Sequence, residues 1–116
     1  MPKTYGFNDR LSLVDHYAEH ATDFGATSPE EYEALADEFL GSATPRSGTM
    51  ECTRRQGRDM IRYDPVTDEF GVLTWDRVIR TYYKPVPCAS LPPGAPRIKC
   101  HKHTDNISYF KQICLS

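Results

Sequence analysis

The amino-acid sequence predicts an α+β domain, in which two N-terminal helices pack on a roughly four-stranded antiparallel sheet, followed by a loop-rich tail and a short C-terminal helix. Three observations support this prediction. Apolar residues recur at helical spacing in two segments before residue 42. Between residues 49 and 83, short segments of alternating polarity are separated by hairpin-length breaks. The length of 116 residues suffices for one modest core and is too short for two domains.

The first helix is expected from about Leu11 to Thr22. Its apolar face comprises Leu13, Val14, Tyr17, Ala21 and Phe24. An N-cap is available from Asn8, Asp9 or Ser12. His20 falls at the edge of the apolar face with His16 next to it, so we expect His20 to be half buried. We interpret residues 1–10 as a poorly ordered remnant of an upstream linker and residues 11–116 as the domain.

A second helix begins at Ser28-Pro29-Glu30-Glu31. Ser28 is the expected N-cap, Pro29 suits the first helical position, and Glu31 closes a capping box. Apolar residues then recur at helical spacing at Tyr32, Leu35, Ala36, Phe39 and Leu40, and Gly41 ends the helix. The acidic first turn suits the helix dipole, so we assign this helix a structural role.

Four strands are expected at Thr49–Arg54, Arg58–Tyr63, Glu69–Thr74 and Arg77–Tyr83. Their core side is assigned to Met60, Ile61, Tyr63, Phe70, Val72, Leu73, Val78 and Ile79. Strand alternation places Thr81 and Tyr83 on one face together with Ile79. Arg80 and Tyr82 then point to the other face, unless a bulge intervenes.

The tail after Pro85 is expected to be a loop as far as Pro96, and Asp105 or Asn106 can cap a short final helix. The four cysteines, Cys52, Cys88, Cys100 and Cys114, allow two disulfides in three pairings. We expect one disulfide that holds the tail, or free thiols if the chain acts in a cytoplasm. A zinc site using cysteines with His101 and His103 is disfavoured, because no Cys-x-x-Cys is present.

The charge distribution is uneven although the net charge is only −2. Residues 1–44 carry Lys3 and Arg10 against nine acidic residues, whereas residues 45–116 carry twelve Lys and Arg against seven acidic residues. The basic sheet could accept a polyanion on one side, or the two halves could simply attract each other. No apolar run approaches the ~18 residues of a membrane span, and the first residues do not begin a signal peptide.

The order of motifs resembles a known family of toxins. The motifs are His20-Ala21-Thr22-Asp23-Phe24-Gly25, then Arg54 to Tyr63 with Asp64-Pro65, and then Arg80-Thr81-Tyr82-Tyr83-Lys84-Pro85. They are similar to the nuclease domain of colicin D and to C-terminal toxin domains of contact-dependent inhibition and Rhs proteins, within the barnase/EndoU/colicin/RelE-like ribonucleases. The similarity spans about residues 13 to 85 and does not include the tail.

This resemblance implies a metal-independent endoribonuclease without a cofactor, acting on RNA, with tRNA and its anticodon loop as the expected target. It implies a cognate immunity protein as partner, and delivery as the C-terminal part of a larger toxin into a target-cell cytoplasm. We expect a monomer. The family histidine falls on His20, its hydroxyl residue on Thr81, its aromatic residue on Tyr83 and a basic residue on Lys84.

One departure concerns a lysine that family members carry shortly before the histidine, where this chain has Tyr17, Ala18 and Glu19. Either His16, Lys84 or an arginine of the sheet substitutes for this lysine, or the chain is a weakened or inactive relative.

The chemistry of the residues agrees with the resemblance. RNA cleavage without metal needs a base for the 2′-hydroxyl proton, an acid for the departing 5′-oxygen, and donors or cations at the phosphoryl oxygens. The candidate catalytic residues are His20, Thr81, Tyr83, Lys84 and His16. The candidate substrate-binding residues are Arg80, Arg62 and Arg58. Two alternatives stay open: a toxin nuclease acting on another RNA or on DNA, and a non-catalytic secreted module stabilised by cysteines or zinc.

Overall fold

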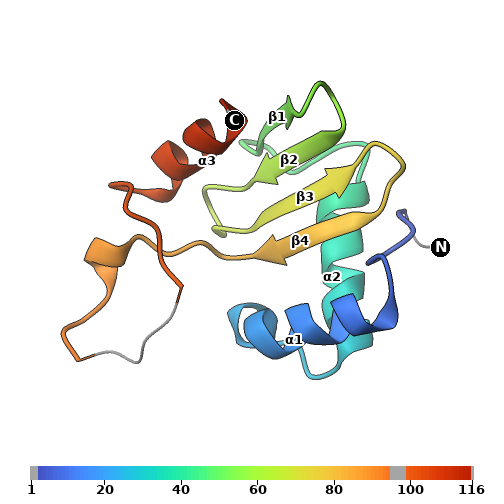
Figure 1. Cartoon of the computed structure of the whole chain (residues 1–116), viewed down its shortest axis with the longest axis horizontal. Coiled ribbons are helices and arrows are strands. Elements are labelled where there is room, and N and C mark those ends of the chain that lie inside the picture. The colour runs from blue at the N-terminus through green and yellow to red at the C-terminus, as the bar shows by residue number, and fades with distance from the viewer. Residues whose placement is uncertain (1–2, 95–98, 116) are drawn as a thin grey trace.

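The computed structural model describes residues 3–94 and 99–115 and confirms the predicted α+β fold (Figure 1). The helices are α1 (Arg10–Phe24), α2 (Pro29–Gly41) and α3 (Asn106–Cys114). The strands are β1 (Met50–Arg54), β2 (Asp59–Tyr63), β3 (Phe70–Thr74) and β4 (Ile79–Tyr83). Residues 85–94 are a loop with one 3-10 turn, Cys88–Ser90, and residues 95 and 96 of the predicted loop lie outside the described residues. None of the described helices is long and apolar enough to cross a membrane.

The helix ends follow their sequence signals. The Asp9 carboxylate caps α1 by accepting the Ser12 backbone N–H at 2.7 Å. Ser28 caps α2 in the same way, but the Glu31 side chain reaches back to the backbone N–H of Thr27 instead of closing the predicted box on Ser28. Both helix starts are therefore fixed by side chains that the sequence identified.

The sheet has the order β1-β2-β3-β4 with every pair antiparallel. The register contains a bulge, because Val72 lies opposite Thr81 while Leu73 lies opposite Ile79, which leaves Arg80 as the extra residue. Tyr82 and Ile79 consequently share the face under α1 and α2. The prediction that Ile79 shares a face with Tyr83 is wrong for this reason.

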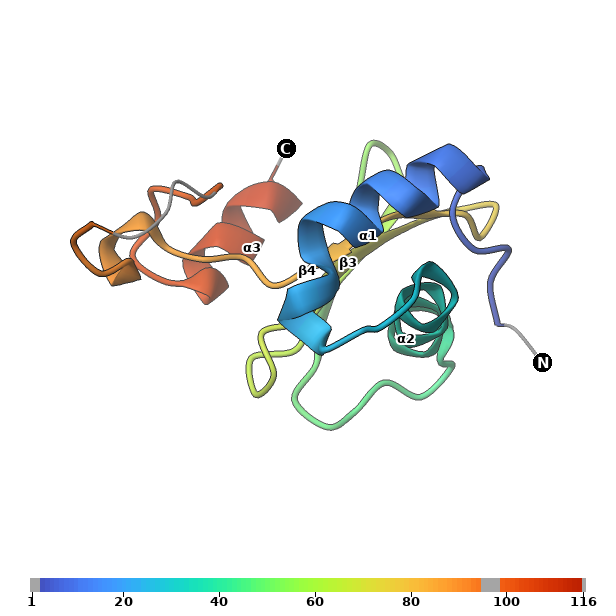
Figure 2. The same ribbon diagram turned by 90° about the horizontal axis from the view of Figure 1, so that it is seen from below.

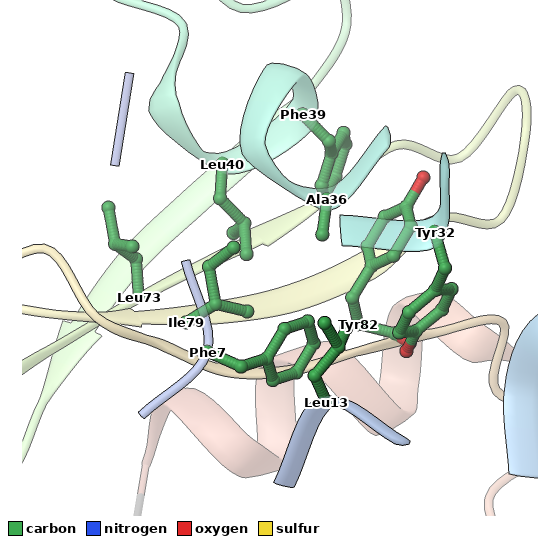
Figure 3. Packing of buried hydrophobic residues seen from close by; sticks show 9 residues of the cluster. All are labelled: Phe7, Leu13, Tyr32, Ala36, Phe39, Leu40, Leu73, Ile79 and Tyr82. Atoms are coloured by element: carbon green, nitrogen blue, oxygen red, sulfur yellow. The ribbon is translucent and has the colours of Figure 1, made fainter. Parts of the chain in front are cut away.

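Both faces of the sheet carry apolar clusters, so the predicted core side is in fact divided between two faces. The larger cluster lies between the sheet and the first two helices (Figure 3) and comprises Phe7, Leu13, Tyr32, Ala36, Phe39, Leu40, Leu73, Ile79 and Tyr82. The smaller comprises Ile61, Tyr63, Phe70, Val72 and Phe110. Phe110 belongs to α3, so the C-terminal helix covers the second face, apart from the layer formed by α1 and α2 (Figure 2).

The segment at residues 3–9 is packed against the domain, which corrects the expectation of a poorly ordered linker. Phe7 is 6% exposed within the larger cluster and forms a bridge with Ile79. The Asp37 carboxylate on α2 accepts the backbone N–H groups of Lys3 and Thr4 at 2.8 and 2.7 Å. The N-terminal segment is thus held by both packing and hydrogen bonds.

Two disulfides hold the tail, so the expectations of a single bridge or of free thiols are wrong. Cys52 of β1 joins Cys114 of α3, and Cys88 joins Cys100 within the tail. These bonds remove the thiolates that a zinc site would need. In the described part of the chain no group of three or more His, Cys, Asp or Glu residues is arranged to hold a metal ion.

Candidate active site

A cleft of about 780 Å³ opens between the C-terminal half of α1, the end of β4 and the tail. It is lined by all five residues predicted to be catalytic: His16, His20, Thr81, Tyr83 and Lys84. The tail adds Lys99, His101 and Tyr109 to its walls. Residues that lie far apart in the sequence therefore meet in one concave site.

His20 is held at the wall of the cleft with 17% of its side chain exposed. Its ring stacks on the Tyr83 ring, with centroids 5.2 Å apart and planes inclined by 25°. His20 Nδ1 lies 3.7 Å from Asp23 Oδ2, and Nε2 lies 3.8 Å from Glu19 Oε2. Both distances exceed a hydrogen bond, so the two carboxylates flank the imidazole without occupying its nitrogens.

His16 is one turn earlier on α1, and its ring centroid is 6.3 Å from that of His20. Its Nδ1 donates to the Ser12 carbonyl oxygen at 2.9 Å. A carbonyl oxygen only accepts, so Nδ1 carries the hydrogen and Nε2 is the nitrogen that can gain or lose a proton. The local helix backbone thereby fixes the tautomer of neutral His16.

Tyr83 supports the site rather than supplying a free hydroxyl. Burial, followed by the hydrogen bond with Tyr109, raises the pKa of the Tyr83 hydroxyl far above its ordinary value. The hydroxyl therefore stays protonated and is already paired with the Tyr109 hydroxyl of α3. Its ring remains available as a surface on which His20 rests.

Thr81 and Lys84 border the same cleft from β4 and the residues after it. Thr81 is half buried, and its hydroxyl makes no hydrogen bond within residues 3–94 and 99–115. The Lys84 backbone N–H donates to Asp23 Oδ2 at 3.2 Å, and its ammonium lies 5.5 Å from the Phe24 ring centroid. Asp23 thus connects the last turn of α1 to the end of β4, next to His20.

The three predicted substrate-binding arginines do not line the cleft. Arg62 is 6% exposed, and its Nη1 donates to the carbonyl oxygens of Phe39 and Leu40 at the end of α2. It caps a helix inside the domain, so its assignment to substrate is wrong. Arg58 is exposed in the turn between β1 and β2, and Arg80 pairs with Asp59.

Sequence reasoning missed the contribution of the tail. Lys99 Nζ lies 2.9 Å from Glu19 Oε1, and the hydrogen bond from Lys99 is the main reason that the pKa of the Glu19 carboxyl falls below its ordinary value. Asp23, three residues after His20, was identifiable from spacing on one helix face. Lys99 was not, since nothing local in the sequence connects it to α1.

His101 lines the cleft but its ring nitrogens are both engaged. Nε2 pairs with Asn106 Oδ1 at 2.7 Å, while Nδ1 lies 3.3 Å from the His103 backbone N–H. Asn106 donates its amide to the Pro85 carbonyl, which leaves Oδ1 as an acceptor for His101. These contacts satisfy a neutral imidazole, so His101 serves to anchor the tail.

Comparisons with known proteins give little beyond this geometry. No protein-family model matches the chain, and no curated protein sequence matches it. Among solved structures, a ribonuclease from Escherichia coli complexed with its inhibitor protein is similar at 22% identity and a TM-score of 0.46. That similarity covers 67% of this chain and 87% of the other. Because both values are low, we interpret the site from its own residues.

Proposed function

We propose that this domain is an endoribonuclease that cleaves RNA by attack of a 2′-hydroxyl on the adjacent phosphodiester. The observation that carries the proposal is the pair of histidines, His16 and His20, that face one cleft with Thr81 and two lysines. In-line cleavage requires a base at the 2′-oxygen and an acid at the 5′-oxygen on the opposite side of the phosphorus. Two histidines whose ring centroids are 6.3 Å apart are proposed to fill these two positions with the phosphate between them.

The proposed reaction assigns each group a task. One histidine removes the 2′-hydroxyl proton as the bond between the 2′-oxygen and phosphorus forms. The other donates a proton to the 5′-oxygen as its bond to phosphorus breaks, which leaves a 2′,3′-cyclic phosphate and a 5′-hydroxyl. We assign His20 one of these tasks because its ring is braced by Tyr83 and flanked by Asp23. His16 Nε2 is the available partner.

Charge that develops on the phosphoryl oxygens needs nearby donors. The Thr81 hydroxyl is uncommitted to any described residue, and Lys84 and Lys99 line the same cleft. Lys99 extends from the tail to Glu19 on α1. In the resembled family, a lysine lies in this part of the helix, shortly before the histidine. We propose that Lys99 supplies the positive charge that the α1 sequence lacks.

The finer assignments rest on the resemblance to colicin D-like toxin domains. We propose that the substrate is tRNA, that a cognate immunity protein blocks the cleft, and that a monomer delivered from a larger toxin acts in a target-cell cytoplasm. An uneven charge distribution agrees with a local site for RNA, because the acidic α1–α2 half would repel a nucleic acid that covered the whole surface.

The test is to express the wild type and the His20→Ala variant in bacterial cells and to sequence RNA termini. We expect new RNA ends at defined sites with the wild type, concentrated in tRNA, and none with His20→Ala. An Arg10→Gln variant, altered at an exposed ion pair with Glu30, serves as the control that retains activity. New ends confined to another RNA would refute tRNA as target. A harmless wild type that produces no new RNA ends would refute the nuclease assignment.

A further inference from the structure

A buried carboxylate outside the cleft is surrounded by three arginines. Asp59, at the start of β2, is 2% exposed. Arg80 Nε lies 3.2 Å from Asp59 Oδ1, and Arg54 Nε and Arg55 Nη1 lie 3.5 and 3.9 Å from Oδ2. One negative charge thus faces three positive charges, and two of the positive charges are left without a counterion in this group.

The arginine cluster, defined as Arg54, Arg55 and Arg80, lies on the sheet next to the cleft. Arg80 is the bulge residue of β4 and directly precedes Thr81 of the cleft. The Arg54 guanidinium is close enough to the Tyr83 hydroxyl for its charge to oppose the rise in the Tyr83 pKa. In Figure 1 the β1–β2 and β3–β4 turns lie at the end of the sheet away from α3. The cluster therefore lies toward the opposite end of β4 from Lys84, and the neighbouring residues Arg80 and Thr81 connect it along the strand to the candidate site.

Neutralising Asp59 does not require three arginines, since one well-placed guanidinium is sufficient to pair a buried carboxylate. Three guanidiniums around one carboxylate repel one another, and a second anion would relieve that repulsion. Arg54 Nε and Asp59 Oδ2 are both buried without a hydrogen-bond partner among the described residues. The Arg55 and Arg80 side chains are 50% and 43% exposed, so their remaining N–H groups can reach a ligand.

We propose that Arg54, Arg55 and Arg80, organised by Asp59, bind a backbone phosphate of the RNA that flanks the scissile one. The inference rests on the proposed ribonuclease function. Guanidinium groups bind phosphate through paired N–H donors, and a fixed carboxylate holds them in place before the ligand arrives. The position of Arg80 beside Thr81 favours the strand that is being cleaved over a separate ligand, because the two residues are neighbours on β4.

The experiment measures the affinity of a short 2′-O-methylated oligoribonucleotide, which cannot be cleaved, for the wild type and for Arg55→Gln and Arg80→Gln. We expect each variant to raise Kd by about tenfold at 50 mM salt. The slope of log K against log salt should shrink by about 0.7 per lost phosphate contact. Arg10→Gln removes the same charge from an exposed ion pair on α1 and should match the wild type.

Thermal unfolding of each variant checks the fold. If Arg80→Gln fails to fold, Arg55→Gln decides the question, because Asp59 then keeps two arginine partners. A wild type that cleaves RNA while both variants keep its affinity and salt slope overturns this inference alone. A wild type that neither binds nor cleaves RNA overturns the proposed function and the subsite together. Lost binding to an oligoglutamate peptide, with unchanged oligonucleotide binding, would assign the cluster to a protein partner and refute the subsite.

Discussion

Removing the Cys52–Cys114 disulfide by a double substitution to serine is expected to lower the free energy of unfolding more than removing Cys88–Cys100. The first bond joins residues 62 apart and fastens α3 to β1, whereas the second joins residues only 12 apart. A cross-link stabilises mainly by restricting the unfolded chain, and its effect grows with the length of the closed loop.

The chain-entropy relation gives a magnitude for each bond at 25 °C. A loop of 62 residues corresponds to about 4 kcal/mol, and one of 12 residues to about 3 kcal/mol. Removing the Cys52–Cys114 bond should also disturb the candidate site, because it frees α3. Tyr109 of α3 pairs its hydroxyl with that of Tyr83, and the His20 ring stacks on Tyr83. We therefore expect the Cys52/Cys114 variant to lose RNA cleavage at temperatures where its α3 detaches.

The assay is urea unfolding followed by far-ultraviolet circular dichroism, because Trp75 is 75% exposed and its fluorescence would report little on folding. Unfolding free energies are compared among the wild type and the two double-serine variants, and RNA cleavage is measured at the same temperature. A loss below about 1 kcal/mol for Cys52/Cys114→Ser, or a larger loss for Cys88/Cys100→Ser, would refute the reasoning from loop length.

Three further predictions follow from individual residues. Burial alone would raise the pKa of Asp37, but hydrogen bonds from Thr4 and Lys3 outweigh burial and lower this pKa. The ionised Asp37 therefore stabilises the fold fully above about pH 5, and this contribution is lost as pH falls through the folded-state pKa. Asp37→Asn should make the free energy of unfolding depend less on pH in the acidic range, and an unchanged dependence would contradict this. Asp23→Asn keeps an oxygen that can accept the Lys84 N–H but removes the negative charge near His20. The kcat for RNA cleavage should therefore fall about tenfold or more with little change in KM. A change confined to KM would argue against a role of Asp23 in positioning His20. Arg62→Met removes the hydrogen bonds to the Phe39 and Leu40 carbonyl oxygens. It should lower the free energy of unfolding, measured in urea, by about 2–3 kcal/mol and leave RNA affinity unchanged. Weaker RNA binding at unchanged stability would return Arg62 to the substrate-binding residues.

The elements of the fold were predictable because their signals are local. Ser28-Pro29 starts α2 and Asp9 caps α1, since capping depends on residues within one turn. The bulge at Arg80 was not predictable, because it depends on how Leu73 and Val72 of the neighbouring strand pair with β4. Without the bulge, alternation alone places Ile79 on the wrong face.

The sequence motifs predicted five residues that line one cleft, but they did not predict how the sheet arginines are oriented. His20, Thr81 and Tyr83 belong to motifs with a recognisable order, and they line one cleft. The sequence around an arginine in a strand does not show whether its side chain points to solvent or into the domain. Arg62 points into the domain and donates to carbonyl oxygens at the end of α2, which is distant in the sequence. Lys99 lines the cleft next to Cys100, which is bonded to Cys88, and the spacing of these residues in the sequence could not reveal that position.

The chemical nature of the RNA ends tests the central claim most directly. Purified domain is incubated with total cellular RNA in the presence of EDTA, and the new termini are identified by mass spectrometry. Proton transfer by His16 and His20 predicts 2′,3′-cyclic phosphate and 5′-hydroxyl ends, which His20→Ala abolishes. Ends that carry 5′-phosphate and 3′-hydroxyl, or cleavage that persists unchanged in His20→Ala, would contradict the account.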